Sequence, residues 1–330
     1  MSVPSAVDVI ILSWNRVDDT IAAVNSAASQ KDVDARILIV DQGSEPECLA
    51  QLEALVSSLP NAQLKKLSAN SGVAGGRNIA TAMGDAPYVV ALDSDAIFAD
   101  ESMLARAVAR LSCDENLCAI GFRIRNHFTG EDDATSWDYP AGCSPSERFP
   151  TTRFVGAGHA IRRSSFEAVG GYDSRLFFCG EELDLCYRML NLGMRIQYDP
   201  EVVIRHKVSP EHRVFWERGR FFYTVRNALY SMYKFEIPRS RRVLGGIAFL
   251  VKGIRNGVFL HALRAIAASR GLSREFRNCA GEAAAYKLKP ATWSYIFQHE
   301  RTRNDSLMTK ILRQLSLLPR QGNLSERQRT

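Results

Sequence analysis

The chain has 330 residues, of which 46% are hydrophobic and 24% charged, a balance that excludes disordered and fibrous proteins. Its net charge of +6 is unevenly distributed, because residues 211–330 carry 23 Lys and Arg against 8 Asp and Glu, a net charge of +15. We therefore expect an acidic body, residues 1–210, joined to a basic segment whose neighbour is an anionic membrane surface, an anionic substrate or a nucleic acid.

Neither the cysteines nor the hydropathy pattern indicates export or a membrane span. The seven cysteines form no Cys-x-x-Cys pair, and an odd, scattered set is typical of a reduced, cytosolic protein. The first eight residues lack the basic start and long apolar core of a signal peptide. The longest apolar run of the basic segment, residues 243–251, is about half a membrane span. The sequence predicts a cytoplasmic protein without a transmembrane helix.

The first part of the chain alternates predicted strands and helices. Apolar strands are expected at residues 7–12, 35–40 and 64–67, and helices at residues 18–29 and 46–59. Strands that alternate with helices every few tens of residues are typical of βαβ units and a mostly parallel sheet.

A glycine-rich segment follows at residues 70–78 and leads into a predicted helix that reaches Met83. Gly72, Gly75 and Gly76 surround the helix start, where they let the backbone approach a ligand and where exposed N–H groups favour an anion. The same glycines suit a tight turn with close helix–strand packing, and a single glycine-rich loop does not decide between the two.

A buried strand is expected at residues 88–95, and it delivers Asp93 and Asp95 to its carboxyl end, where open α/β sheets bind ligands. Two carboxylates one residue apart repel each other unless a cation lies between them. Hard oxygen ligands at this spacing suit Mg²⁺ or Mn²⁺ that holds a diphosphate. The alternative is that Asp93 caps the next helix and Asp95 is solvated.

The middle of the chain predicts a helix at residues 102–112, a strand at 119–125, a glycine-interrupted strand at 154–161 and a short helix at 163–169. Between them, residues 126–152 contain glycines and prolines with little periodicity. A loop of this length in a compact domain is usually functional or mobile.

Three acids, Glu181, Glu182 and Asp184, open a predicted helix that ends at Gly193. The helix dipole explains one or two acids at this place, but three in four residues exceed what capping requires. The buried stripe of this helix is expected to consist of Leu183, Cys186, Tyr187 and Leu190.

Two short strands are expected next, at residues 195–198 and 202–205, and His206 follows the second. A lone histidine is more often a structural hydrogen-bonding group than a ligand. This one, like the paired acids, lies where a strand ends.

The basic segment combines arginines with aromatic residues, as at Arg213, Phe215, Trp216 and Arg226. Such a composition suits base stacking or a helix on anionic lipid headgroups. Residues 243–265 predict one amphipathic helix with its basic residues outside the apolar arc. That helix either lies on a membrane or packs on the catalytic domain with a solvated charged face. Residues 304–330 are expected to fray.

The ordered set of segments resembles glycosyltransferase family 2, in particular its bacterial, rhamnosyltransferase-like members. The matching segments are Ser-Trp-Asn-Arg at 13–16, Asp-Gln-Gly-Ser at 41–44, the glycine-rich 70–78, Asp-Ser-Asp at 93–95, Gly-Gly-Tyr-Asp at 170–173, and the acidic helix start with His206 after it. The match spans residues 7–206, whereas the last third resembles only loosely the helical tails of bacterial members.

The resemblance implies a GT-A fold, which is an α/β architecture with a mostly parallel sheet flanked by helices. Residues 1–210 would form the glycosyltransferase domain, with a nucleotide-binding half at 1–95 and an acceptor and catalytic half at 96–210. Residues 211–330 would form a basic, mostly helical extension.

The resemblance also implies how the donor is held. Asp41 would accept the N3–H of uracil or thymine, and Arg77 would lie near the base or the diphosphate. Asp95 would ligate Mg²⁺ or Mn²⁺, Asp93 the ribose or the metal, and His206 the metal. The donor-binding residues implied are Ser13, Asn15, Arg16, Asp41, Gly72, Gly76, Arg77, Asp93 and Ser94.

The implied reaction is an inverting transfer of a sugar from a UDP- or dTDP-sugar to an acceptor hydroxyl, in which a metal acts as a Lewis acid on the departing diphosphate. The family base matches the Glu181–Glu182 pair, with a glutamate where the family has an aspartate. The position favours Glu182 as the base, Glu181 as an orienting group and Asp184 behind it, with Asp173 as the next candidate.

The expected acceptor is a saccharide or lipid-linked saccharide of a bacterial surface polysaccharide or glycolipid, reached by peripheral attachment to the inner face of the plasma membrane. The alternatives are a sugar-phosphate nucleotidyltransferase, whose glycine-rich loop would follow the first strand, and a non-catalytic nucleotide-sugar-binding scaffold. We expect no nucleic-acid partner.

Overall fold

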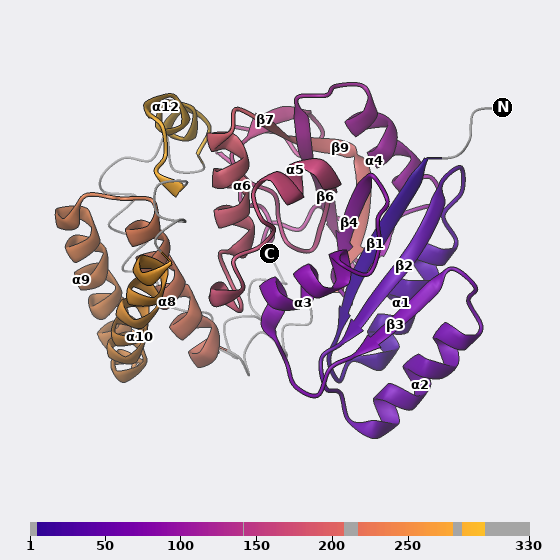
Figure 1. The fold of residues 1–330 in the computed structure, drawn as a ribbon, viewed down its shortest axis with the longest axis horizontal. Helices are drawn as coiled ribbons and strands as arrows, with labels where there is room; N and C mark the ends of the chain where they lie inside the picture. The colour runs from indigo at the N-terminus through magenta and orange to yellow at the C-terminus, as the bar shows by residue number, and fades with distance from the viewer. Residues whose placement is uncertain (1–4, 141, 208–216, 280–285, 301–330) are drawn as a thin grey trace. The chain divides into compact units, whose positions relative to one another are not determined.

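The computed structural model describes residues 5–140, 142–207, 217–279 and 286–300 (Figure 1). The chain divides into two compact units. The first comprises Met1–Phe177, Glu181–Val208 and Tyr295–Arg301, and the second comprises Phe178–Gly180, Ser209–Ser294 and Thr302–Thr330.

One nine-stranded sheet forms the centre of the first unit, with strand order β3-β2-β1-β4-β8-β6-β9-β5 and with β7 paired to β9. The pairings make β1, β2, β3, β4, β6 and β9 run in one direction and β5, β7 and β8 in the other. The strands are β1 (Ala6–Ser13), β2 (Asp34–Asp41), β3 (Ala62–Lys66), β4 (Tyr88–Leu92), β5 (Ala96–Phe98), β6 (Leu117–Asn126), β7 (Phe149–Thr151), β8 (Gly158–Arg162) and β9 (Arg195–His206). The predicted α/β class with a mostly parallel sheet is confirmed.

Both faces of this sheet are buried, because successive side chains of a strand point to opposite faces. Ile37 and Ile39 of β2 belong to the core that includes residues of α1, α2 and α4, whereas Leu38 and Val40 belong to the core that includes α3. Figure 1 shows α3 in front of the sheet. The helices of this unit are α1 (Val17–Ala28), α2 (Pro46–Ser57), α3 (Gly72–Thr81), α4 (Met103–Ser112), α5 (Arg163–Ala168) and α6 (Glu181–Asn191), with a 3₁₀ turn at Ser174–Leu176.

The two short strands expected at 195–198 and 202–205 form one strand, β9, with an irregularity in the middle. Asp199 pairs with Phe122 and Val203 pairs with Arg123, so Pro200 and its two successors bulge out of the ladder. Proline has no N–H to donate, and a bulge is where a strand tolerates it. The strand therefore continues past Pro200.

Three other expectations about the first unit are wrong in detail. The loop expected over residues 126–152 contains β7, and the glycine-interrupted strand begins only at Gly158. On α6, Leu183 is half-buried whereas Leu185 and Met189 are buried. This helix is buried on nearly all sides instead of along one stripe.

The second unit is a helical body with α8 (Glu217–Lys234), α9 (Arg239–Arg255) and α10 (Phe259–Asn278), whose core includes Phe221, Val225 and Ala262. A further helix, α12, spans Pro290–His299. The single amphipathic helix expected at 243–265 is wrong, because the chain breaks between α9 and α10 at Gly257, whose φ is +67°. None of the helices in the described ranges is long and apolar enough to cross a bilayer. The predictions for Arg213, Phe215, Trp216 and residues 304–330 lie outside the described residues.

Candidate active site

The carboxyl end of β4 and the end of β9 meet through β5. Asp93 and Asp95 lie in the turn between β4 and β5, and Ala96 at the start of β5 pairs with His206 at the end of β9. The Lys207 N–H also donates to the Asp95 carbonyl at 2.7 Å. The ligand atoms of Asp93, Asp95 and His206 consequently lie within 4.8 Å of one another.

This set of donors fits a divalent cation, since carboxylate oxygens are ligands of Mg²⁺ and Mn²⁺ and an imidazole is a ligand of first-row transition metals such as Mn²⁺. His206 Nε2 lies 3.3 Å from Asp95 Oδ1, and Arg16 Nη1 lies 2.8 Å from Asp95 Oδ2. Burial raises the pKa of Asp95, but hydrogen bonds and charge from His206 and Arg16 outweigh it and hold that pKa below its usual range. Burial lowers the pKa of His206, but Asp133 and Asp95 outweigh it and raise the pKa to about 9. Metal binding to this imidazole would therefore release a proton.

Arg77 connects the paired acids to the start of α6. Its guanidinium donates to Asp93 Oδ1 at 3.0 Å, to Glu182 Oε1 at 2.8 Å and to the Gly156 carbonyl at 2.8 Å. The residue is only 3% exposed. The resemblance implied that Arg77 lies near the base or the diphosphate, and this stays a prediction. In the structure these three bonds make it a buried link between the metal-site acids and the candidate base.

The three acids at the start of α6 have different surroundings. The Glu182 side chain is 17% exposed, whereas Glu181 is 2% exposed and its Oε2 has no hydrogen-bond partner in the described part of the chain. Burial, followed by the charge of Glu182, raises the pKa of Glu181 well above its usual range. Asp184 is fully buried and pairs with Arg188 at 2.8 Å, one helical turn away. Of these acids, Glu182 is the one with a partly exposed carboxylate beside the metal-site residues, and Asp184 pairs with Arg188.

Gly156 is a site residue that the sequence did not single out. A Cβ at this position would lie 2.2 Å from Glu182 Oε1, so only glycine leaves room for the Glu182 carboxylate and its bond to Arg77. The residue lies in the segment expected as a glycine-interrupted strand, and in that pattern a glycine indicates only an interruption of the strand.

The glycines at the start of α3 allow close packing, as the second of the two interpretations expects, and their contact with a donor stays a prediction. Gly72 has a φ of +77°, and a Cβ there would lie 2.4 Å from the Phe177 carbonyl, which also accepts the Val73 N–H. A Cβ on Gly76 would lie 3.0 Å from Leu12 and from Gln42 Oε1. Both glycines allow α3 to approach other parts of the protein closely.

The carboxyl ends of β1 and β2 are tied together by polar side chains. Asp41 accepts the N–H groups of Gly43 and Ser44, at 3.1 and 3.0 Å, and the Ser44 hydroxyl. Asn15 accepts the Glu45 N–H at 2.7 Å. These two strand ends are therefore fixed in one rim.

Two other predicted donor-binding residues lie in the same region, and a third residue there was missed. Ser13 hydrogen-bonds Thr20 at 3.3 Å, and Ser94 lies half-buried between the paired acids. Gln42, which the sequence did not single out, accepts from the Ser71 N–H and hydroxyl at 3.1 and 2.9 Å and so joins the rim to the start of α3.

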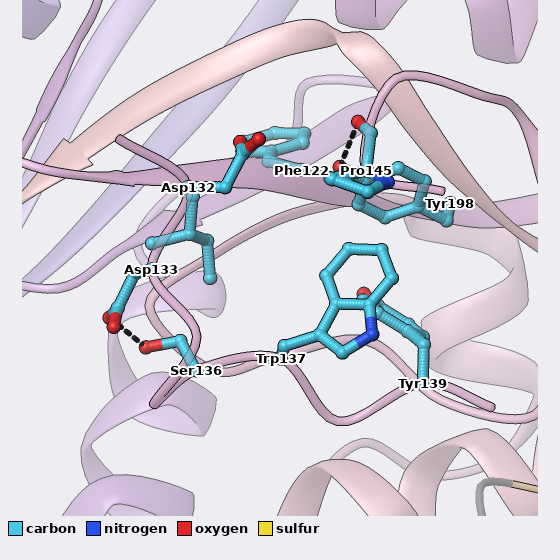
Figure 2. A pocket seen from close by; sticks show the side chains of 9 residues that line it. Phe122, Asp132, Asp133, Ser136, Trp137, Tyr139, Pro145 and Tyr198 are labelled. Carbon is cyan, nitrogen blue, oxygen red and sulfur yellow. Dashed lines mark hydrogen bonds between the residues drawn. The ribbon is translucent and has the colours of Figure 1, made fainter. Parts of the chain in front are cut away.

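The loop between β6 and β7 supplies one more residue that the sequence missed. Asp133 Oδ2 lies 3.8 Å from His206 Nδ1 and accepts the Ser136 hydroxyl at 2.6 Å. Figure 2 shows Asp133 and Ser136 beside a small pocket that Trp137 and Tyr139 line. That pocket measures about 10 Å³, room for roughly one water molecule, so it is no sugar site. The loop instead holds Asp133 against His206.

The chain is similar to known proteins over this region. The model of the family described as Glycosyl transferase family 2 matches residues 8–170. A pre-mycofactocin glycosyltransferase of Mycobacterium tuberculosis is 26% identical over 195 residues, which cover 57% of this chain and 40% of that protein. An uncharacterized Haemophilus influenzae protein is 30% identical over 173 residues, 50% of this chain and 91% of that protein. The O-antigen chain rhamnosyltransferase RfbN of Salmonella typhimurium is 25% identical over 195 residues, 56% of this chain and 60% of that protein.

Two solved structures share the fold. The mannosyltransferase PcManGT from Pyrobaculum calidifontis, in complex with GDP-Man and Mn²⁺, has a TM-score of 0.58 at 17% identity and covers 95% of this chain and 86% of its own. GalNAc-T7 with UDP, GalNAc and Mn²⁺ has a TM-score of 0.55 at 17% identity, over 68% of this chain and 51% of its own. At this identity the likeness concerns the fold. The chain spans 40% and 60% of the lengths of the two named relatives.

Proposed function

Because this chain belongs to glycosyl transferase family 2, we propose that it is a metal-dependent, inverting glycosyltransferase that uses a UDP- or dTDP-sugar and a saccharide acceptor. The observation that carries the proposal is the joining of Asp93, Asp95 and His206 to Glu182 through Arg77. Family membership supports sugar transfer over the nucleotidyltransferase and scaffold alternatives.

In the proposed reaction the acceptor hydroxyl attacks the anomeric carbon, the bond from that carbon to the diphosphate oxygen breaks, and the Glu182 carboxylate takes the hydroxyl proton. A single displacement inverts the anomeric centre. A divalent ion held by Asp93, Asp95 and His206 would neutralise charge on the departing diphosphate. Arg77 and the space left by Gly156 hold Glu182 in place.

The proposed preference for a pyrimidine rests on Asp41. Its carboxylate accepts three hydrogen bonds from Gly43 and Ser44, and an ionised carboxylate offers about four lone-pair positions. One position accepts no hydrogen bond from the described residues, and we assign it to the N3–H that uracil and thymine share, which would have to reach a side chain that is 1% exposed. Guanine presents its own N–H groups at a different place on a larger ring.

The proposed acceptor is a saccharide or lipid-linked saccharide of a bacterial surface polysaccharide or glycolipid. The basic composition of residues 211–330 supports peripheral attachment to the inner face of the membrane, where a lipid-linked acceptor is available.

The test is thermal unfolding of the full chain with UDP, dTDP or GDP, each with and without Mn²⁺, because a ligand that binds the native state raises the melting temperature. We expect UDP or dTDP to stabilise the protein only with Mn²⁺, and Asp95→Asn to remove the Mn²⁺-dependent part. Equal stabilisation by GDP would refute the pyrimidine preference. Release of UDP or dTDP from a matched donor, followed by analysis of the anomeric configuration of the product, tests the transfer and its inversion.

A further inference from the structure

The second unit contains a groove of about 550 Å³ that is lined by residues of α8, α9 and α10. Its apolar residues are Leu229, Val243, Ile247, Leu250 and Ile266. Its arginines are Arg239, Arg242, Arg270, Arg274 and Arg277, and no acidic residue is among the described residues that line it. The groove is thus apolar and cationic at once.

The positive charge of the groove has no counterpart within the described residues. Residues 239–278 contain nine Lys and Arg but one acid, Glu275. Among the ion pairs of the described segments, none involves any of the five groove arginines. Guanidinium groups gathered in this way repel one another, and a bound anion relieves that repulsion.

Tyr233 orders two of these arginines. The guanidinium carbons of Arg242 and Arg277 lie 5.2 and 5.7 Å from the centre of its ring, and Arg277 Nε donates to its hydroxyl at 3.0 Å. The Arg242 Nε is buried and has no hydrogen-bond partner among the described residues. Tyr233 therefore holds two of the groove arginines in fixed orientations.

The apolar surface continues from the groove onto α9 and α10. Val243 and Ile247, which line the groove, are 53% and 51% exposed, and Leu244, Ile254 and Leu260 are 63–64% exposed. Apolar side chains that gather on one exposed surface mark an interaction site. A molecule that complements this surface carries an anionic group and a hydrocarbon part.

A nucleic acid fits the groove less well than a lipid. Base binding uses aromatic faces as stacking platforms, and the one aromatic lining residue, Tyr233, has Arg242 and Arg277 at its ring. The apolar residues would stay exposed to water beside a polyanionic backbone. Guanidinium groups match phosphate oxygens in a bidentate geometry, which suits a phospholipid headgroup equally well.

We propose that this groove binds the phosphate headgroup of an anionic phospholipid in a bilayer surface, while the exposed apolar side chains of α9 and α10 enter the boundary between headgroups and acyl chains. The proposal rests on the membrane attachment proposed above and assigns it to particular residues. The arginines supply charge-assisted hydrogen bonds, and the leucine and isoleucine side chains supply burial of apolar surface.

The test is flotation of the full chain with phosphatidylcholine vesicles that contain or lack phosphatidylglycerol. The groove variant is Arg270→Gln with Arg274→Gln, two exposed arginines that form no side-chain hydrogen bond or ion pair within the described residues. The matched control is Arg241→Gln with Arg255→Gln, which removes the same charge from exposed positions of α9 outside the groove. We expect the groove variant to bind anionic vesicles roughly 30-fold more weakly, since each basic residue at an anionic surface contributes about 1 kcal/mol. The control removes the same charge outside the groove, so we expect it to lose clearly less binding than the groove variant, whereas a non-specific charge effect would weaken both by the same roughly 30-fold.

An Ile247→Gln variant tests the apolar half of the site, and half exposure of this residue makes the substitution compatible with folding. It should weaken binding to anionic vesicles, and retention of full binding would overturn the apolar contribution. Equal losses in the groove variant and its control, or equal binding of the wild-type chain to neutral and anionic vesicles, would overturn the headgroup site. Loss of binding to duplex DNA in the groove variant with vesicle binding unchanged would assign the groove to nucleic acid instead. The Mn²⁺-dependent shift with UDP or dTDP, measured on the same preparations, reports the donor site separately.

Discussion

Glutamine substitution at the two adjacent acids of α6 separates the candidate base from its neighbour. Glu182→Gln keeps the shape of the side chain, and the amide oxygen still accepts from Arg77, but it takes no proton from an acceptor hydroxyl. General-base catalysis contributes about 10²–10⁴-fold to a rate, so we expect kcat to fall by at least about 10² while donor binding is kept.

Glu181→Gln should have a small effect on kcat and a measurable effect on stability. Burial and the charge of Glu182 raise the pKa of Glu181 well above the ordinary value of 4.5, so the native state binds this proton more tightly than the unfolded chain does. The free energy of unfolding therefore decreases as pH rises from about 4.5 towards the raised value. A neutral glutamine does not titrate, so it removes this decrease in the free energy of unfolding. The variant should therefore become more stable relative to wild type as pH rises across this range.

The assay for both variants is initial-rate transfer with saturating donor and Mn²⁺, together with urea unfolding at several pH values. If Glu181→Gln proves the slower enzyme, the base is Glu181 and the exposure argument is wrong. If neither substitution slows transfer, the start of α6 is structural and Asp173 is the next candidate, although it accepts from Arg175 Nε at 2.7 Å. A flat pH dependence of the stability difference would refute the burial argument for Glu181.

Three further substitutions test the surroundings of the site. Gly156→Ala places a Cβ 2.2 Å from Glu182 Oε1. Because small misplacements of a catalytic group are costly, kcat should fall about tenfold or more while the circular dichroism spectrum stays unchanged. A wild-type kcat in this variant would contradict the contact. Asp95→Ala should abolish transfer and the Mn²⁺-dependent thermal shift while the fold is kept, and full wild-type activity in excess EDTA would refute the metal requirement. Asp133→Asn should weaken Mn²⁺ affinity in direct titration by roughly tenfold, the usual effect of losing a group that orients a ligand such as His206; unchanged affinity would show that the loop does not act on the imidazole.

The parts of the site that the sequence predicted lie at the ends of apolar runs. Five consecutive apolar or aromatic residues predict that β4 is a buried strand. The end of this run also predicts where the strand ends, directly before Asp93 and Asp95. The same holds for the end of β9 at His206. These ends meet because β5 pairs with β9, and no local pattern predicts that pairing. Only the resemblance to a family implied that His206 and the paired acids lie together.

The residues that were missed depend on long-range contacts. Gly156 matters because α6 brings Glu182 to it, and Asp133 matters because its loop returns to β9. Neither residue stands in a local pattern of acids or glycines that differs from an ordinary loop. Likewise, the bulge at Pro200 hides the continuity of β9, because a proline ends most strands and only pairing to β6 shows that this strand continues.

The basic helical unit shows where sequence periodicity stops being informative. Val243, Ile247, Val251 and Ile254 lie within α9, at a spacing that puts them on one side of the helix. Periodicity alone leaves open whether such an arc is covered by protein, and in the structure these residues are 41–64% exposed. A buried apolar arc is covered by protein. An apolar arc that remains exposed next to five arginines instead indicates a binding partner with both hydrocarbon and anionic groups. A bilayer surface with phosphate headgroups provides both, and this is the reason for the headgroup site that we propose.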